Sequence, residues 1–266
     1  MGKLIRRMGI PTFAVSALLL VVLIAAYVMG QSLPVLFTDI LRRVGMNGIL
    51  VLAMVPSIKS GVGPNFALPI GIVGGLFALM CCMQMDLMGW SLILLAIIIC
   101  GLMGWAYGKL MNAVKGAEMT IATYTGFSIV AFFNILWLSL PFSNRKMGWM
   151  LGDGLRETIQ MDGFAADKIV SNFLSFNIGE VTIPTGMILL LLLTCFVVSV
   201  FFKTKTGLAI YAGGVNPKFA EAAGLNIDRS RVIANIISTV LAGIGIIIYS
   251  QGYGYAQIYN GPLNMA

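Results

Sequence analysis

The 266-residue chain is 59% hydrophobic and only 10% charged, and its mean hydropathy is +0.94. Because soluble domains carry roughly 25% charged residues, this composition excludes a water-soluble globular protein and predicts an all-α, polytopic membrane protein. The sequence contains no histidine, which is the commonest general base and metal ligand, and no GxxxxGK[ST] phosphate loop. We therefore expect neither an enzyme nor a metal site.

Seven apolar stretches are long enough, or nearly so, to cross the hydrocarbon core, which needs about 20 helical residues. They cover about 10–30, 44–58, 66–84, 90–108, 119–140, 182–202 and 232–250. Basic residues precede the first stretch as in a signal peptide, but no small-residue cleavage site follows, so we interpret it as an uncleaved helix. Tight connections elsewhere predict a single transmembrane domain over residues 1–266.

The charged residues predict which ends of these helices face the cytoplasm. With the N-terminus inside, the inner segments carry a net charge of +8 and the outer segments a net charge of −1, which together give the +7 of the chain. This is the positive-inside pattern, so the pI of 9.4 requires no nucleic acid partner. We expect a multi-pass protein of the bacterial plasma (inner) membrane, in contact with membrane lipid. Residues 141–181, long enough for a short helix and some turns, would lie outside and residues 203–231 inside.

The polar residues in or beside the predicted spans are neutral. No acidic residue lies at the centre of a span, which argues against proton coupling but leaves sodium coupling open. Four of the neutral residues are candidates for the wall of a translocation path, namely Asn47, Ser57, Asn65 and Asn134. A weakly polar path suits a neutral hydroxylated solute, although the same side chains could instead make hydrogen bonds between helices.

A stretch rich in proline and glycine, residues 56–75, precedes and opens the third span. Prolines and glycines interrupt a helix and free backbone groups, so this stretch could form a broken or re-entrant element beside the path. The alternative is a tight turn followed by a glycine-faced helix. The helical spacing of Gly71, Gly74 and Gly75 favours close packing for the part that follows the prolines.

The inner segment after the sixth span contains the pattern of a short capped helix over residues 216–224. Asn216 can accept from the free amides of a first turn, Pro217 suits the first helical position, and Gly224 suits the end. A helix of two turns persists only when it packs on something. Phe219, Ala220 and Ala223 offer an apolar face, either to the membrane domain or to a second protein.

The same segment resembles the cytoplasmic loop of the permeases of ABC importers for ribose, galactose and related solutes, the branched-chain-amino-acid/monosaccharide permease superfamily. The similar positions are Lys203, Thr204, Lys205, Thr206, Gly207, Gly213, Gly214, Asn216, Ala220, Ala222, Ala223, Gly224, Leu225 and Asn226. Residues 40–50 are similar to the family's entry into an early helix. The family's GGIDLSVG-like stretch has lost its aspartate and serine here, at residues 60–71, and the family's last helices are expected to be lacking after residue 250.

The resemblance implies that this chain is the permease subunit of an ATP-binding-cassette importer for a small hydrophilic solute, a monosaccharide or related sugar. It implies an ATPase-coupling role for Asn216, Pro217, Phe219, Ala220, Glu221, Ala222, Ala223 and Gly224. The implied partners are a cytoplasmic ATPase that uses ATP and Mg²⁺, a second permease subunit and an extracytoplasmic solute-binding protein; the chain itself would hold no cofactor. The alternative is a secondary transporter or channel without an ATPase.

Overall fold

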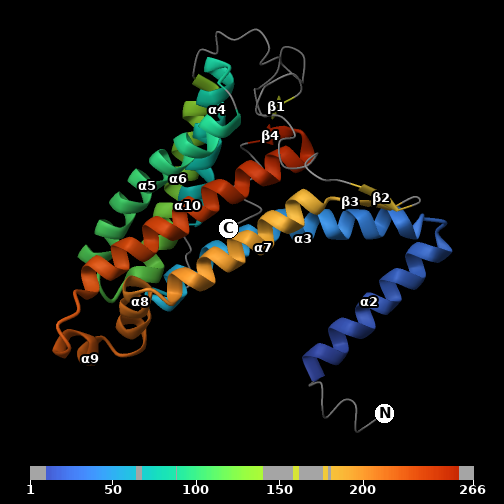
Figure 1. Cartoon of the computed structure of the whole chain (residues 1–266). Helices are drawn as coiled ribbons and strands as arrows, with labels where there is room; N and C mark the ends of the chain where they lie inside the picture. Colours follow the sequence, from blue (N-terminus) through green and yellow to red (C-terminus); the bar gives the residue numbers. More distant parts are fainter. Residues whose placement is uncertain are drawn as a thin grey trace.

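The computed structural model describes residues 10–63, 68–87, 89–139, 158–161, 176–178 and 181–257, and within them it contains nine α-helices and four short strands (Figure 1). The helices are α2 (Ile10–Val28), α3 (Leu33–Lys59), α4 (Leu68–Met85), α5 (Gly89–Ala113), α6 (Glu118–Ser139), α7 (Thr185–Phe202), α8 (Lys205–Val215), α9 (Pro217–Ala222) and α10 (Ile227–Tyr253). The strands are β1 (Thr158–Gln160), β2 (Phe176–Ile178), β3 (Val181–Ile183) and β4 (Tyr255–Gln257).

Each of the seven predicted spans coincides with a helix. Five of these helices, α4, α5, α6, α7 and α10, are long and apolar enough to cross a membrane, which confirms a polytopic helical membrane protein. The second span is longer than predicted, because α3 begins at Leu33 rather than near residue 44. Pro34 is tolerated in its first turn, and the charged residues that follow remain helical.

Helix α10 lies at the centre of the bundle and packs on α3, α4 and α5 (Figure 1). It runs antiparallel to α3, where the Ser238 hydroxyl donates a hydrogen bond of 2.6 Å to the carbonyl oxygen of Ala53. It is also antiparallel to α5, where the Thr239 hydroxyl donates to the carbonyl oxygen of Cys100 at 3.1 Å. Both bonds join α10 to a backbone carbonyl oxygen of a neighbouring helix in an apolar interior, so they help to fix the rotation of α10.

Glycines bring α4 and α10 into close contact, so α4 has the closely packed glycine face that the spacing of Gly71, Gly74 and Gly75 predicts. A Cβ atom on Gly71 would lie 2.6 Å from the Ala242 Cβ, and one on Gly75 would lie 2.8 Å from the Cα of Gly243. Real Cβ atoms essentially never approach so closely. The two helices are parallel, since Gly71 faces Thr239 and Ala242 and Gly75 faces the following turn of α10.

Helix α4 begins deeper in the bundle than its neighbours. Gly71 is the fourth residue of α4, whereas the facing Thr239 is the thirteenth residue of α10. At 1.5 Å per residue, α4 therefore starts roughly 13 Å beyond the first residue of α10. The last residues of α3 and the first residues of α10 lie at the same end of the bundle. Of the proline- and glycine-rich stretch, residues 64–67 lie outside the described residues.

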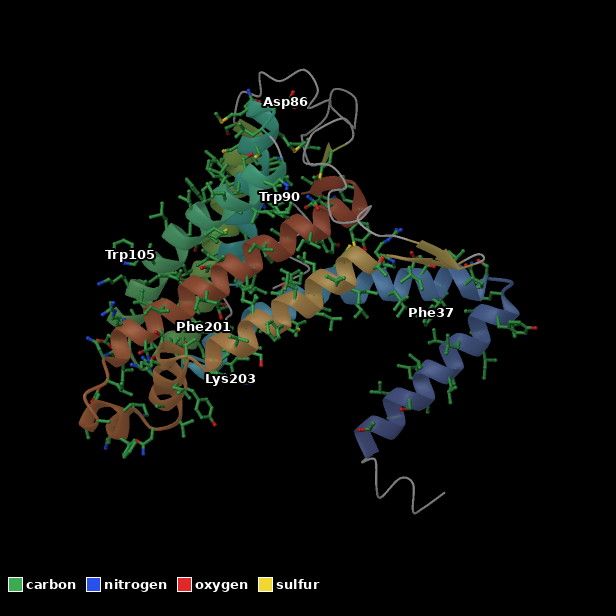
Figure 2. All side chains as sticks on the ribbon, viewed as in Figure 1. Phe37, Asp86, Trp90, Trp105, Phe201 and Lys203 are labelled. Carbon is green, nitrogen blue, oxygen red and sulfur yellow. The ribbon has the colours of Figure 1, made fainter. Side chains whose placement is uncertain are left out.

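The two ends of the bundle differ. The end that holds α8 and α9 is called the loop end here; Lys203 lies there and Asp86 lies at the opposite end (Figure 2). At the opposite end β1 pairs antiparallel with β4, which joins residues 158–160 to the end of α10. Strands β2 and β3 form a second antiparallel pair. Within the predicted outer segment, 141–181, the structure describes residues 158–161, 176–178 and 181, which form β1, β2 and the start of β3, with Met161 directly after β1.

Candidate functional site

Two short helices, α8 and α9, follow α7 at the loop end, and the sequence predicts only the second. Thr204 caps the start of α8, and its hydroxyl accepts a hydrogen bond of 3.2 Å from the Gly207 amide. Asn216 separates the two helices, and its side-chain oxygen accepts from the amide of Phe219 at 3.1 Å. Pro217 occupies the first position of α9, so the predicted capping geometry is confirmed.

The end of α9 is closed by a glycine in the left-handed conformation. Gly224 has φ +80°. Its amide donates to the carbonyl oxygen of Glu221 at 2.9 Å, and the Leu225 amide donates to that of Ala220 at 3.0 Å. This pair of bonds is the Schellman arrangement, which satisfies the last carbonyls of a helix. Both ends of this six-residue helix are thus fixed by local hydrogen bonds.

The two faces of α9 have different environments. Ala220 is fully buried and holds α9 against α8 and α10, whereas the Phe219 side chain is 69% exposed. The remaining predicted coupling residues of α9, together with Ala223 and Gly224, are also exposed. Phe219 and Ala220 therefore do not share a face, contrary to the expectation of one apolar face. The helix rests on the protein through one alanine and presents an aromatic side chain outward.

Helix α8 connects α9 to the end of α3 through two glycines. A Cβ atom on Gly214 would lie 2.9 Å from the amide nitrogen of Gly61, and still closer to the carbonyl oxygen of Lys59. The backbones of α8 and of the turn after α3 are therefore in direct contact. The Lys59 ammonium lies 4.3 Å from the ring centroid of Phe202 and 5.7 Å from that of Tyr211, so cation–π contacts reinforce the same junction.

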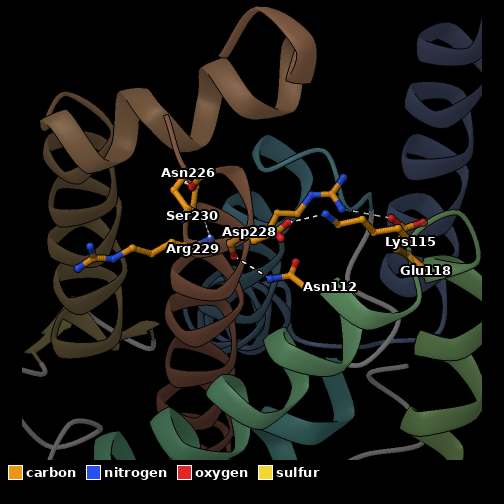
Figure 3. A network of polar contacts seen from close by, with 8 residues as sticks. Asn112, Lys115, Glu118, Asn226, Asp228, Arg229 and Ser230 are labelled. Atoms are coloured by element: carbon orange, nitrogen blue, oxygen red, sulfur yellow. Dashed lines mark hydrogen bonds and ion pairs between the residues drawn. The ribbon is translucent and has the colours of Figure 1, made fainter. Parts of the chain in front are cut away.

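A polar network joins the start of α10 to the turn between α5 and α6 (Figure 3). The Asn112 side-chain amide donates to the carbonyl oxygen of Asp228 at 2.8 Å, and Lys115 pairs with the Asp228 carboxylate at 2.7 Å. Arg231 pairs with Glu118 at 3.3 Å, and both of these side chains are mostly buried. The network fixes the loop ends of three helices relative to one another.

A cavity of about 480 Å³ opens between α3, α10 and the start of α4. It is lined by Arg43, Asn47, Leu50, Val51, Met54, Leu68, Tyr249 and Tyr253. Arg43 and Tyr253 lie toward the end opposite α9, whereas Met54 and Leu68 lie toward the middle of the bundle. The rings of Tyr249 and Tyr253 are 4.8 Å apart between centroids. Among the described residues, the lining combines two aromatic rings, an amide and a guanidinium, and none of these residues carries a carboxylate.

Of the three predicted path residues that the structure describes, Asn47 alone lines this cavity. Ser57 is fully buried in the last turn of α3, where its hydroxyl donates to the carbonyl oxygen of Gly63 at 3.2 Å. Asn134 lies on α6 with a buried side-chain oxygen that has no hydrogen-bond partner in the part of the chain described. Asn65 lies outside the described residues.

One buried polar residue, Asn235 of α10, is absent from the sequence-based candidates. It is fully buried, and neither its side-chain oxygen nor its nitrogen has a hydrogen-bond partner within the described residues. The signal in the sequence is its spacing from Ser238 and Thr239, which places three polar side chains on one face of an apolar helix. Among the described residues no cluster of histidine, cysteine, aspartate or glutamate could hold a metal ion.

Comparison with known proteins identifies relatives of the chain. Residues 36–265 match the family described as branched-chain amino acid transport system, permease component. The nucleoside ABC transporter permease protein NupB of Lactococcus lactis subsp. cremoris is 26% identical over 155 residues, which are 58% of this chain and 40% of that protein. The fructose import permease protein FruG of Bifidobacterium longum is 34% identical over 88 residues, which are 33% of this chain and 24% of that protein.

A third relative is the probable branched-chain amino acid transport permease protein LivH of Methanocaldococcus jannaschii. It is 30% identical over 98 residues, which are 35% of this chain and 30% of that protein. The matches therefore span less than half the length of each of these relatives. No solved structure matches the chain.

Proposed function

Because the chain belongs to the family of branched-chain amino acid transport system permease components, we propose that it is the membrane subunit of an ATP-driven importer. In this proposal the loop end faces the cytoplasm and the Arg43 end of the cavity faces outward across the bacterial plasma membrane. Residues 216–224 dock on a separate ATPase, which uses ATP and Mg²⁺. A second permease subunit, identical or related, and an extracytoplasmic solute-binding protein complete the importer.

The observation that carries this proposal is the exposure of Phe219 on a helix that is fixed at both ends. A large aromatic side chain that stays 69% exposed beside Lys218 and Glu221 has an apolar surface to bury. Aromatic residues are enriched at the centres of protein interfaces. Since Ala220 already holds α9 on the membrane domain, Phe219 remains available to fill a groove on a cytoplasmic partner.

The geometry also supplies a route from α9 to the cavity. A displacement of α9 moves α8, with which it shares Asn216, and α8 is in backbone contact with Gly61 through Gly214. The turn that contains Gly61 directly follows α3, and earlier turns of α3, from Arg43 to Met54, line the cavity. Closure of the ATPase would thus move one wall of the cavity, which is the requirement of alternating access.

For the solute we propose a monosaccharide or related sugar. The rings of Tyr249 and Tyr253 can stack on the apolar face of a sugar ring, while Asn47 and Arg43 can bond its hydroxyls. An amino acid carries an ammonium group that needs an anion, and none of the described residues that line the cavity carries a carboxylate. The volume of about 480 Å³ lies within the usual range for small-molecule sites.

The docking role can be tested with matched substitutions at one position. The chain is co-expressed with a candidate ATP-binding-cassette ATPase, purified in detergent and assayed for co-purification and ATP hydrolysis. Phe219→Glu places a charge at the apolar contact, so co-purification and ATP-driven uptake should fall at least tenfold. Phe219→Tyr keeps the aromatic ring, so co-purification and ATP-driven uptake should both be retained. Equal co-purification of the two variants would overturn the docking role of α9.

Uptake assays decide between the energy sources and among the solutes. Radiolabelled D-ribose, D-fructose, uridine and leucine are supplied to cells that contain or lack the chain. Sugar uptake that stops when the ATPase is inactivated supports the proposal, whereas ATP-dependent uptake of uridine or leucine would overturn the sugar assignment alone. Uptake driven by an ion gradient without an ATPase would instead support the secondary transporter and overturn the whole proposal.

A further inference from the structure

Asn235 is the polar side chain whose surroundings are least explained by the packing of the bundle. Its carboxamide is completely buried in α10, and both its nitrogen and its oxygen lack partners in the described part of the structure. An unpartnered buried amide destabilises the conformation that contains it. By contrast, the neighbouring Ser238 and Thr239 hydroxyls each donate a hydrogen bond to a backbone carbonyl oxygen of another helix.

Helical geometry places Asn235 at the level where α4 starts. It lies one turn before Thr239, which packs against Gly71, and Gly71 lies about one turn after Leu68. On the antiparallel helix α3, Ser57 lies one turn beyond Ala53, whose carbonyl oxygen accepts from Ser238. Asn235 is therefore on the same level as Leu68 and Ser57.

This level is the inner boundary of the cavity. Leu68 and Met54 line its inner end, and Leu68 is only 5% exposed. By helical spacing, Asn235 lies at the level of this inner end, further toward the loop end than the cavity residues Asn47 and Tyr249.

The surroundings of Asn235 favour a neutral ligand. The nearest cationic side chain on α3, Lys59, is engaged with the Phe202 ring at the α8 junction. The next charged residue on α10, Arg231, is paired with Glu118. A charged ligand would have no counter-ion at this level among the described residues. A free N–H donor beside a free carbonyl acceptor matches a hydroxyl group, which both accepts and donates a hydrogen bond.

We propose that Asn235 is the polar group of an inner, closed solute site, which binds a hydroxyl of the neutral solute after Leu68 and Met54 move aside. The proposal rests on the transport function proposed above. It assigns the solute a second binding position, one step further toward the loop end than the cavity lined by Asn47. A water molecule offers the same hydroxyl chemistry, and the two sources predict different results when the amide is removed.

The first test is access to the site by a small thiol reagent and does not require the solute to be known. Asn235→Cys and Ala242→Cys are each made in the full chain after replacement of its four cysteines by alanine. Both positions are fully buried on α10. In membranes that hold the complete transporter, aminoethyl methanethiosulfonate with ATP should label Asn235→Cys at least tenfold faster than without ATP, whereas Ala242→Cys should remain unlabelled. Absence of ATP-dependent labelling of Asn235→Cys would overturn the proposal.

The second test separates solute binding from a structural water. Asn235→Leu is close in shape and removes both unpartnered groups, so its thermal stability in detergent should equal or exceed that of the wild type. For whichever of D-ribose and D-fructose the wild type takes up, the KM for uptake should rise roughly tenfold with the loss of one or two hydrogen bonds. Unchanged KM would assign Asn235 to water or to packing alone and overturn the proposal. If the wild type takes up neither sugar, the sugar assignment proposed above fails, and the labelling test still decides whether the inner site exists.

Discussion

The backbone contact between Gly214 and Gly61 makes a strong prediction for Gly214→Ala. The new Cβ would lie 2.9 Å from the Gly61 nitrogen, against an ordinary contact of at least 3.4 Å, and closer still to the Lys59 carbonyl oxygen. Because both obstacles are backbone atoms, α8 must retreat from α3 by more than 0.5 Å. Overpacking of this kind costs about 1–3 kcal/mol.

Gly213→Ala is the matched control, since Gly213 is the adjacent residue of the same helix. Its new Cβ would meet Ile227 at 3.7 Å, which is an ordinary contact. Both substitutions gain the helix preference of alanine over glycine, about 1 kcal/mol, so this gain cancels in the comparison. We expect Gly214→Ala to be less stable than Gly213→Ala by about 1–3 kcal/mol.

The assay combines thermal unfolding in detergent with ATP hydrolysis and uptake by the assembled transporter. If α8 transmits the movement of α9 to α3, Gly214→Ala should retain ATP hydrolysis but lose most uptake, while Gly213→Ala should retain both. Equal stability and equal uptake of the two variants would refute the assignment of this contact as the link. A loss of assembly in Gly214→Ala alone would show that the junction is structural and would refute its role in transmission.

Two further predictions concern the polar network and the cavity. Arg231→Ala should destabilise the protein by about 2–4 kcal/mol, because it removes the ionic partner of the mostly buried Glu118. Lys115→Ala breaks an ion pair in which both side chains are 54% exposed, so it should cost less than about 1 kcal/mol. Thermal unfolding of the two variants measures the difference, and equal losses of stability would contradict the prediction. Asn47→Cys should react with aminoethyl methanethiosulfonate because Asn47 lines the open cavity, and it should react at least tenfold faster than Asn134→Cys, whose native side-chain oxygen is buried. If Asn47→Cys reacts from neither side of the membrane, Asn47 does not belong to the path.

The sequence predicts the long helices well because apolar length alone defines them. It predicts the capped helix α9 because Asn216, Pro217 and Gly224 each have a strong local preference. Helix α8 escapes prediction because its three glycines, Gly207, Gly213 and Gly214, weaken the helical signal. The contact that requires a glycine at position 214, with the backbone at the end of α3, is visible only in three dimensions.

The cavity and the inner polar site depend on contacts between distant segments. Arg43 reads as an interruption of an apolar stretch, yet it is helical and lines the cavity. Asn235 looks like one polar residue among apolar ones, and its lack of a partner emerges only when α3, α4 and α5 surround it. The β1–β4 pair joins residue 159 to residue 256, a distance along the chain that local patterns do not encode.

The central position of α10 has a consequence for biosynthesis. Helices α3, α4 and α5 leave the ribosome long before α10, and Gly71 precedes its contact residue Thr239 by more than half of the chain. Until α10 enters the membrane, the grooves at Gly71, Gly75, Gly104 and Gly108 have no helix to fill them. The early helices must therefore remain in the bilayer, or in the insertion machinery, without the contacts that α10 later provides. Completion of the bundle is a late, single step that depends on one helix.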